Sequence, residues 1–491
     1  MHIHSPSITY QNPVYPHSSP DPFVLKYCGE YWCYSSGLQP DGRCFGVLHS
    51  PDLVHWTRVG SAMDQLPEGH PLYWAPEVVY WNGVFYLYYS TGDEEYMHLR
   101  VATASHPAGP FIDRGIRLTD EKFAIDAHVF LDSDGTRYMF YATDFLDHER
   151  IGTGTVFDRM LDPFTLAHRP QPVTRARYDW QIFDPHREWK GGVCWHTIEG
   201  PFVLKHNGRY YQMFSGGNYQ NDTYGVGYGV TGSLQTQEEW QQCCDGVKTP
   251  PVLRTVPERG VIGPGHNSVV RGPDNRTLYC VYHRWQLETS ERVMAIDPLG
   301  WEDGRLVVYG PTNTPQTINL PQVSGFKEFS HRIGSCVLDD KQAALTPQPD
   351  DLSGLALAAQ PLPSPSFILE VSLRMKSNHA GCCSGIGLEG SAGRLLCISI
   401  DESEQGPQVV VKTFAGEQRF PLQGFDSLVF HLLRLEVNKG QVVFTLDGDI
   451  LHDGSLFRWQ GQVAGEAVQV NLFSENTSST FAGFAITVLD S

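Results

Sequence analysis

Hydrophobic residues in the first three-fifths of the chain recur in short clusters that share one order. Each copy opens near an acidic residue or a histidine, continues with an apolar triplet, turns at a step such as Asn-Gly or Asp-Gly, and ends in an aromatic-rich segment. The five copies open at Asp21, Pro76, Asp126, Glu199 and His266. A two-residue turn of this kind needs positive φ and matches the twist of paired strands. Each copy therefore predicts a β-hairpin.

The intervals between the copies leave room for two further strands in each unit. Five four-stranded units make a β-propeller, which protects its sheet edges by radial repetition; five unrelated hairpins in a sandwich are the alternative. The innermost strands of a propeller line a central channel. We therefore expect the residues that open the copies, including Asp21, Asp126, Glu199 and His266, to meet at one end of that channel.

The C-terminal third follows a different pattern. Residues 311–327 are rich in Pro, Thr and Asn and predict a linker. Beyond them apolar and polar residues alternate strictly, as in 367–373 and 433–437, which indicates an antiparallel β-sandwich. The whole pattern predicts an all-β protein, with a five-bladed β-propeller catalytic domain over residues 1–318 and an accessory sandwich over residues 326–491. We expect the sandwich to pack on the propeller.

Composition narrows the possible partners. The 48 glycines, 33 prolines and 12% aromatic residues are typical of short strands and turns. A formal net charge of −19 argues against binding to nucleic acid or an anionic membrane, and no apolar run approaches the roughly 18 residues of a membrane span. The 11 cysteines fall in no metal-binding spacing, and the N-terminal segment has no features of a signal peptide. These features favour a cytoplasmic location and leave the oligomeric state open.

Three of the copies contribute a carboxylate, and this combination suits the cleavage of a glycosidic bond. One carboxyl group must protonate the leaving oxygen, while another acts as a nucleophile or as a base for water. Carboxyl groups that share a tight site raise one another's pKa, which keeps the acid protonated near neutrality. A single aspartate is more often a turn cap, but Asp21, Asp126 and Glu199 opening three copies favour a glycosidase site.

Several motifs together resemble those of glycoside hydrolase family 43, over roughly residues 10–315. They are Ser19-Pro-Asp-Pro, Trp74-Ala-Pro-Glu-Val, Ile125-Asp126, Glu199-Gly-Pro-Phe and Gly263-Pro-Gly-His266. The resemblance implies a five-bladed propeller and an inverting hydrolase that acts mainly on arabinose- and xylose-containing polysaccharides. It implies that Asp21 is the general base, Glu199 the general acid and Asp126 the modulator of the acid's pKa. The C-terminal third resembles the concanavalin-like, jelly-roll sandwich that follows the propeller in many members.

Candidate substrate-binding residues surround these motifs. Tyr73 and Trp74 precede a strand and are candidates for an aromatic wall, although a core position between blades suits them equally. The third motif reads Ile-Asp-Ala-His where a proline often follows the aspartate in the family, so we expect His128 near the pocket. Asn218 flanks the fourth copy. In the family an arginine of the last blade faces the pocket; Arg284 and Arg292 are the candidates, and Arg292 is favoured.

His266 is the candidate metal-binding residue. It resembles the family histidine that lies in the channel and, in several members, helps to hold a calcium ion largely through water. A hydrogen-bonded histidine without a metal is an equal alternative. We expect no cofactor to be required for catalysis, and calcium in a structural role is the first candidate ion.

These observations lead to an exo-acting, inverting hydrolase with α-L-arabinofuranosidase or β-D-xylosidase activity on hemicellulose-derived oligosaccharides. An endo-arabinanase and a galactan-directed exo-hydrolase are alternative enzymes. A non-catalytic glycan-binding propeller is an alternative from another class, and the presence of all three carboxylates speaks against it.

Overall fold

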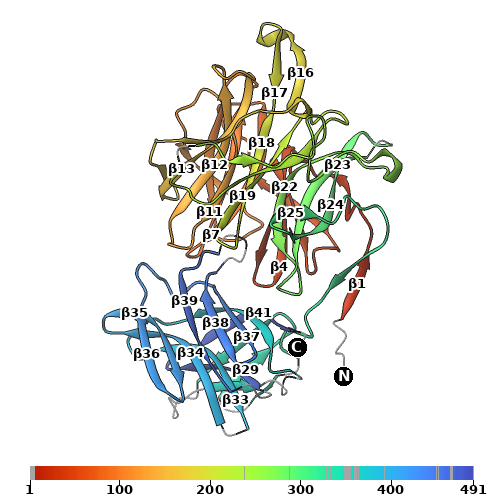
Figure 1. Ribbon diagram of the computed structural model, residues 1–491. Helices are drawn as coiled ribbons and strands as arrows, with labels where there is room; N and C mark the ends of the chain where they lie inside the picture. Colours follow the sequence, from red (N-terminus) through yellow and green to blue (C-terminus); the bar gives the residue numbers. More distant parts are fainter. Residues whose placement is uncertain are drawn as a thin grey trace.

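The computed structural model describes residues 6–489, except residues 237, 287, 328, 332–333, 348–354, 359–361, 363, 392, 449–450, 452 and 465–467. The chain forms two β-rich parts stacked end to end (Figure 1). The helices of the described part are three 3-10 turns: η1 (Asp179–Gln181), η2 (Glu188–Lys190) and η3 (Pro257–Arg259). Within this part no helix is long and apolar enough to span a membrane. The predicted all-β fold, a five-bladed propeller followed by a sandwich, is confirmed.

Each blade is a sheet of mainly antiparallel strands, and its innermost strand comes from one copy of the sequence repeat. Blades 1 and 2 contain β3 (Phe23–Tyr27), β4 (Glu30–Leu38), β5 (Cys44–Ser50), β6 (Thr57–Met63), β7 (Leu72–Trp81), β8 (Val84–Gly92), β9 (Met97–Ala104) and β10 (Ile112–Arg117). Blade 3 contains β11 (Ala124–Leu131), β12 (Arg137–Phe145), β13 (Gly152–Asp162), β14 (Thr165–Leu166) and β15 (Gln171–Thr174), with β16 (Ile182–Arg187) and β17 (Val193–His196) added to the same sheet. Blade 4 contains β18 (Ile198–His206), β19 (Arg209–Gly216), β20 (Gly225–Thr231) and β21 (Gln241–Gln242).

The N-terminal segment closes the ring. Blade 5 contains β22 (Ile262–Arg271), β23 (Leu278–Gln286), β24 (Glu291–Glu302) and β25 (Arg305–Val308), and β2 (Tyr15–Ser18) pairs with β24. The N–H of Ser19 also donates to the carbonyl of Arg292 at 2.8 Å. Closure therefore brings Asp21, only three residues after β2, against the last blade.

The innermost strands all start with the same backbone irregularity. One residue near the start of each strand has positive φ, and in four blades the pairing register shifts there. These residues are Asp21 (φ 52°), Ala75 (44°), Asp126 (61°), Gly200 (57°) and His266 (47°). The predicted alignment of the five copies was wrong by one residue in two of them. Ala75, not Pro76, and Gly200, not Glu199, are equivalent to Asp21, Asp126 and His266. Glu199 lies one residue before the equivalent position.

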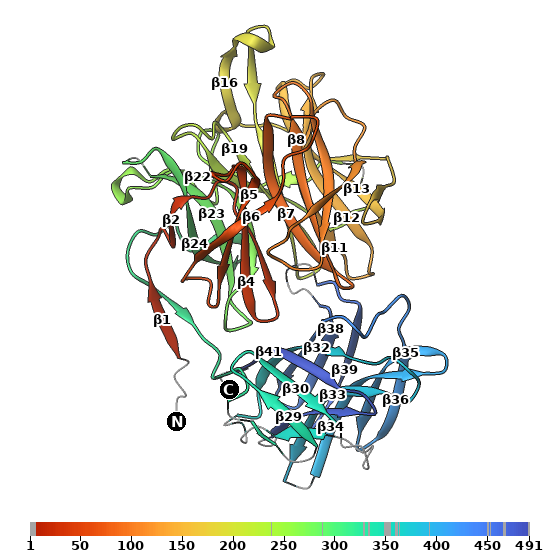
Figure 2. The ribbon, with the colours of Figure 1, turned by 180° about the vertical axis from the view of Figure 1, so that it is seen from behind.

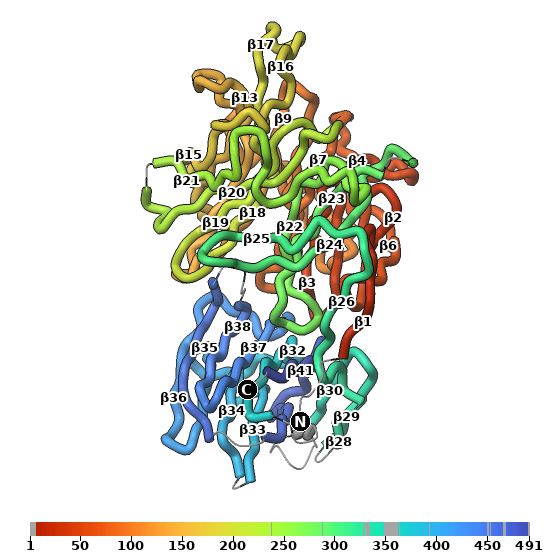
Figure 3. Tube along the Cα trace, turned by 45° about the vertical axis from the view of Figure 1, so that its right-hand side comes forward, coloured from red at the N-terminus to blue at the C-terminus, as the bar shows by residue number. Residues whose placement is uncertain are grey.

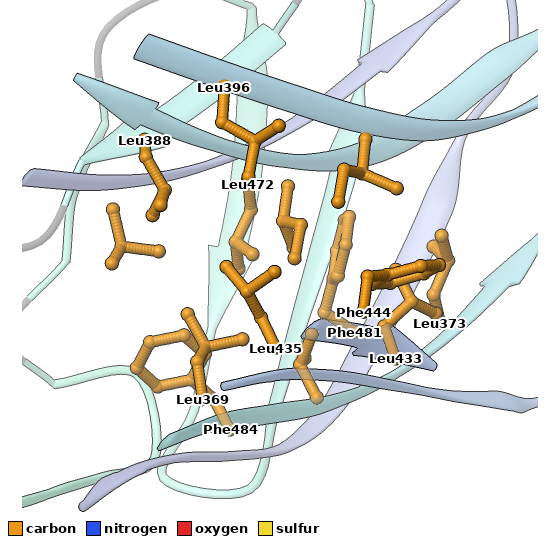
Figure 4. Packing of buried hydrophobic residues seen from close by; sticks show 14 of the residues in the cluster. Leu369, Leu373, Leu388, Leu396, Leu433, Leu435, Phe444, Leu472, Phe481 and Phe484 are labelled. Carbon is orange, nitrogen blue, oxygen red and sulfur yellow. The ribbon is translucent and has the colours of Figure 1, made fainter. Parts of the chain in front are cut away.

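The C-terminal part consists of two sheets packed face to face. One contains β27 (Val323–Ser324), β29 (Ser335–Leu338), β30 (Gln342–Thr346), β32 (Phe367–Met375), β37 (His431–Asn438), β38 (Gln441–Leu446), β39 (Phe457–Gln462) and β41 (Ser479–Val488). The other contains β28 (Ser330–His331), β31 (Leu355–Ala358), β33 (Cys383–Gly390), β34 (Gly393–Ser403), β35 (Gly406–Thr413), β36 (Gly416–Pro421) and β40 (Gln469–Glu475). Alternate residues fill the core between them: Leu369, Leu435 and Phe481 from the first sheet meet Leu388, Leu396 and Leu472 from the second (Figure 4).

Sheet partners change near residue 320. Before it, β26 (Gln316–Asn319) pairs with β1 (Ser7–Tyr10), and the two strands run side by side along the propeller (Figure 3). After it, β27 pairs with β41 of the sandwich. We propose to divide the domains at this change, in line with the ranges 1–318 and 326–491.

The sandwich packs on the turns that follow the innermost strands. Tyr80 Oη donates to the carbonyl of Phe430 at 2.8 Å, and the N–H of Lys205 donates to the carbonyl of Leu451 at 2.8 Å. The backbones of Gly29 and Gly483 also meet, so closely that a Cβ on Gly29 would lie 2.8 Å from the Cα of Gly483. The positive-φ residues lie at the other ends of the same strands, so the described residues of the sandwich do not wall the site that they form.

A buried ion network joins the two parts. Glu370 Oε1, on β32, accepts a hydrogen bond from Arg434 Nη1 at 2.5 Å and forms an ion pair with Arg271 Nη2, from the propeller, at 3.0 Å. All three side chains are less than one-tenth exposed. Burial would raise the pKa of Glu370, but the two guanidinium groups hold it below its ordinary value. Glu370 is therefore charged and compensates two buried cations at the interface.

Replacing Glu370 by Gln should lower the free energy of unfolding by roughly 3–5 kcal/mol, because two buried guanidinium groups lose their counterion. Urea unfolding followed by tryptophan fluorescence measures this loss. Glu436→Gln is the matched control. The Glu436 carboxylate lies 3.4 Å from Arg434 Nη2, but its side chain is 43% exposed, and exposed ion pairs contribute at most about 1 kcal/mol. Equal stability of the two variants would contradict the importance of this network.

Candidate active site

Nitrogen atoms of three side chains surround the Asp21 carboxylate. Its Oδ1 is 3.0 Å from Arg292 Nη1, 3.3 Å from His283 Nδ1 and 3.5 Å from His266 Nδ1. Burial would raise the pKa of Asp21, but the Arg292 guanidinium holds it well below its ordinary value. Asp21 is therefore a carboxylate at neutral pH and can accept a proton.

His283 is a neutral residue that holds the backbone of Asp21. The backbone N–H of Asp21 donates to His283 Nδ1 at 3.1 Å, which requires that nitrogen to be unprotonated. Burial lowers the pKa of His283 to about 4. The 3.3 Å contact with Asp21 Oδ1 is therefore not an ion pair, and the positive charge that faces Asp21 comes from Arg292.

Glu199 has the opposite properties. It is more exposed than Asp21 or Asp126, and Tyr224 Oη donates to its Oε1 at 2.7 Å. Burial raises the pKa of Glu199 to about 7; the hydrogen bond from Tyr224 lowers it, and the charge of Asp21 raises it. A substantial fraction of Glu199 is therefore protonated at neutral pH, so it can donate a proton.

Asp126 is held beside Glu199 by the backbone. The N–H of Gly200, the residue after Glu199, donates to Asp126 Oδ2 at 2.9 Å. Burial raises the pKa of Asp126 well above its ordinary value, and the charges of Glu199 and Asp21 raise it further. Two carboxyl groups that repel each other in this way titrate as a pair. We conclude that the Asp126–Glu199 pair retains a proton near neutrality.

The bond from Gly200 is the exception to a repeated contact between blades. The N–H of the positive-φ residue normally donates to a side chain on the second strand of the preceding blade, whereas Asp126 lies on the innermost strand. The donor–acceptor pairs are Ala75 to Ser36 Oγ (2.7 Å), Asp126 to Ser90 Oγ (3.0 Å), His266 to Ser215 Oγ (2.7 Å) and Asp21 to His283 Nδ1 (3.1 Å). The register places Ala142 at this position of blade 3. The side chain of alanine has no hydrogen-bond acceptor, so the carboxylate of Asp126 accepts the hydrogen bond from the N–H of Gly200 instead.

His266 lines a cavity of about 30 Å³ together with Asp21, Asp126 and Phe202. A cavity of this size holds about one water. Calcium requires six to eight oxygen ligands. In the described part of the chain no group of three or more His, Cys, Asp or Glu side chains is arranged to hold a metal ion, and His266 itself faces Asp21. These side chains do not fit a direct calcium site, so no chemical step is assigned to one.

The remaining predicted residues divide between the pocket and the core. Trp74 is half-buried and occupies the position of blade 2 that Glu199 occupies in blade 4, so it remains a candidate wall of the pocket. Tyr73 is 1% exposed and packs on Phe45, so it belongs to the core.

His128 and Arg284 are corrections of the predicted substrate-binding set. His128 is buried against Glu77, whose Oε2 lies 2.9 Å from its Nδ1, so it contacts the neighbouring blade. Arg284 donates to the carbonyl of Thr312 at 3.2 Å and to Asn313 at 3.0 Å. Because successive residues of a strand point to opposite faces, Arg284 turns away from the site that His283 faces.

The sequence reasoning missed two residues of the site. His283 lies beside Arg284 in the Tyr-His-Arg-Trp segment, and strand alternation was the signal that could have distinguished them. Tyr224 has no motif, and only its contact with Glu199 identifies it. The predicted Asn218 donates to the carbonyl of Phe183 at 3.1 Å and so positions the β16–β17 segment.

The chain is similar to several known proteins. Residues 10–306 match the family model of the glycosyl hydrolases family 43. A β-D-galactofuranosidase from Aspergillus niger is 27% identical over 341 residues, which cover 64% of this chain and 87% of that protein. An extracellular exo-α-(1→5)-L-arabinofuranosidase from Streptomyces avermitilis is 24% identical over 57% of each chain, so this chain spans little more than half of that relative.

Two solved structures are also similar. A thermostable family-43 glycoside hydrolase is 34% identical over 62% of this chain and 98% of that chain, with a TM-score of 0.55. A xylan β-1,4-xylosidase from Bacillus halodurans aligns with 97% of this chain and 100% of that chain, at 17% identity and a TM-score of 0.51. The second similarity shows that the two chains share a fold over their whole length.

Replacing Tyr224 by Phe should raise the pKa of Glu199 above about 7, because the carboxylate loses the hydrogen bond that stabilises it. Carbon-detected NMR titration of labelled glutamate carboxyl groups measures this pKa. Tyr228→Phe removes a hydroxyl group four residues away that has no contact with Glu199 and should leave the pKa in place. A lower pKa in Tyr224→Phe would contradict the role of this hydrogen bond.

Proposed function

Because this chain belongs to glycoside hydrolase family 43, we propose that it is an inverting exo-hydrolase that removes terminal α-L-arabinofuranosyl or β-D-xylosyl residues from hemicellulose-derived oligosaccharides. The observation that carries the proposal is the contrast between Asp21 and Glu199. Arg292 keeps Asp21 ionised, whereas burial keeps Glu199 partly protonated near neutrality. A base and an acid are thus ready at the same pH, as hydrolysis by inversion requires.

In the proposed reaction Asp21 takes a proton from water as the water attacks the anomeric carbon. Glu199 gives its proton to the glycosidic oxygen as the bond to the leaving sugar breaks. Tyr224 then stabilises the Glu199 carboxylate through the hydrogen bond to Oε1. Asp126 opposes that charge, which favours the return of a proton to Glu199 before the next turnover.

The choice of sugar rests on the relatives. The Streptomyces avermitilis protein is named as an exo-arabinofuranosidase, which supports an arabinofuranosyl substrate. The Aspergillus niger protein is named as a β-D-galactofuranosidase, and this makes a terminal galactofuranosyl residue the second candidate. The p-nitrophenyl glycosides of arabinofuranose, xylose and galactofuranose compare the three sugars directly. If the protein hydrolyses none of the three, the proposal is contradicted.

Replacing Glu199 by Gln should lower kcat/KM for a disaccharide of the preferred sugar by roughly 10²–10⁴-fold, the usual contribution of a general acid. The loss should be smaller for the p-nitrophenyl glycoside, because nitrophenolate leaves without a proton. Steady-state kinetics on both substrates measures the difference, and NMR of the first-formed product should show the inverted anomer.

Glu404→Gln, an exposed position on the sandwich, is the control and should behave as the wild type. Equal losses of Glu199→Gln on the two substrates would contradict the assignment of Glu199 as the acid. A first product with retained configuration would contradict inversion.

The pH dependence of kcat/KM should fall on the alkaline side near pH 7, where Glu199 loses its proton. The acid limb should lie well below, because Asp21 must be ionised to act as a base and Arg292 lowers its pKa. Arg292→Met removes that charge, so the pKa of Asp21 rises and the acid limb moves to higher pH. Arg305→Met, an exposed arginine, should move neither limb; an unmoved acid limb in Arg292→Met would contradict the role of Arg292.

A further inference from the structure

A hairpin made of β16, η2 and β17 projects from the propeller at the end opposite the sandwich (Figures 1 and 2). It extends the sheet of blade 3, where β17 pairs in parallel with β13 through Gly152 and His196. Only two residues separate His196 from Glu199. The base of the hairpin therefore lies close to the proposed general acid.

Side-chain contacts connect the hairpin to the proposed base as well. The Phe183 ring lies 6.3 Å from the Tyr219 ring, and the Arg292 guanidinium lies over Tyr219 at 5.1 Å. Arg292 in turn contacts Asp21 at 3.0 Å. Asn218 fixes this arrangement by donating to the Phe183 carbonyl at 3.1 Å. The base of the hairpin is thus part of the rim of the active site.

Cationic side chains brace the aromatic residues of the hairpin. The Arg187 guanidinium lies 4.2 Å from the Trp189 ring and 4.9 Å from the Trp195 ring. Lys190 Nζ lies 4.8 and 4.9 Å from the same two rings and 3.5 Å from Asp144. Cation–π contacts of this kind hold both partners in place. Trp189 nevertheless stays 51% exposed, so part of a braced indole faces solvent.

The position of Glu199 decides which part of a substrate would meet this indole. A general acid protonates the glycosidic oxygen, so it lies on the side of the leaving sugar. The hairpin starts from that same side. A braced, half-exposed aromatic ring beside a few polar groups is the usual composition of a binding site for a neutral ligand with an apolar face.

We propose that the β16–β17 hairpin binds the leaving sugar, with the exposed part of Trp189 as the stacking surface for a neutral sugar ring. This inference rests on the proposed function, because it takes Glu199 as the acid. Arg187 and Lys190 hold the indole, and the carboxylate of Asp144 offsets the charge of Lys190. The ligand is thus an uncharged saccharide unit on the leaving-group side of the bond that breaks.

Two substrates with the same glycosyl group test the inference. The disaccharide has a leaving sugar, whereas the corresponding glycosyl fluoride has none. Trp189→Ala should lower kcat/KM for the disaccharide by roughly tenfold, the loss of one aromatic contact, and leave kcat/KM for the fluoride unchanged. Trp189→Phe, which keeps an aromatic ring, should recover part of the loss.

Phe414→Ala is the matched control, since Phe414 is an 83% exposed aromatic residue of the sandwich and should change neither rate. Equal losses on both substrates, or no loss on either, would overturn the hairpin as the site of the leaving sugar while the hydrolase itself stands. A wild-type protein that cleaves neither substrate would overturn the proposed function, and this inference with it.

Discussion

The fold depends on one repeated demand of the backbone: the N–H of a strained residue must find an acceptor in the neighbouring blade. Each innermost strand starts with a residue of positive φ, a conformation that costs a non-glycine residue roughly 1–3 kcal/mol. It persists because the preceding blade accepts its N–H, through a serine in three cases and through His283 in the fourth. The same bonds link adjacent blades.

This demand also explains the place of Asp126. Blade 3 has Ala142 where the other blades have a hydrogen-bonding side chain, so the N–H of Gly200 needs a different acceptor. The carboxylate of Asp126 supplies it at 2.9 Å and is thereby fixed beside the backbone of Glu199. One carboxyl group thus completes the ring of contacts between blades and forms a coupled pair with the proposed acid. Catalytic geometry and propeller assembly share this hydrogen bond.

The repeat in the sequence was sufficient to predict the blades, because apolar triplets and turns have a fixed order within each strand pair. It could not give the register to a single residue: Glu199 was aligned with Asp21 and Asp126, yet Gly200 is the equivalent position. The same uncertainty of one residue led to Arg284 rather than its neighbour His283. Tyr224 could not be predicted from the sequence, because its contact with Glu199 arises from the packing of a loop that belongs to no repeat.

The two ends of the innermost strands have separate tasks. At one end the turns pack so closely on the sandwich that the backbones of Gly29 and Gly483 are in contact. Glu370, Arg271 and Arg434 form a buried ion network at this same interface. At the other end the strands begin with irregular backbone and carry the carboxylates. Since the described residues of the sandwich pack at the opposite end, the surroundings of the pocket come from segments inserted between blade strands. Selectivity for what lies beyond the terminal sugar must therefore arise from the propeller itself, and β16–β17 is the insertion next to the acid.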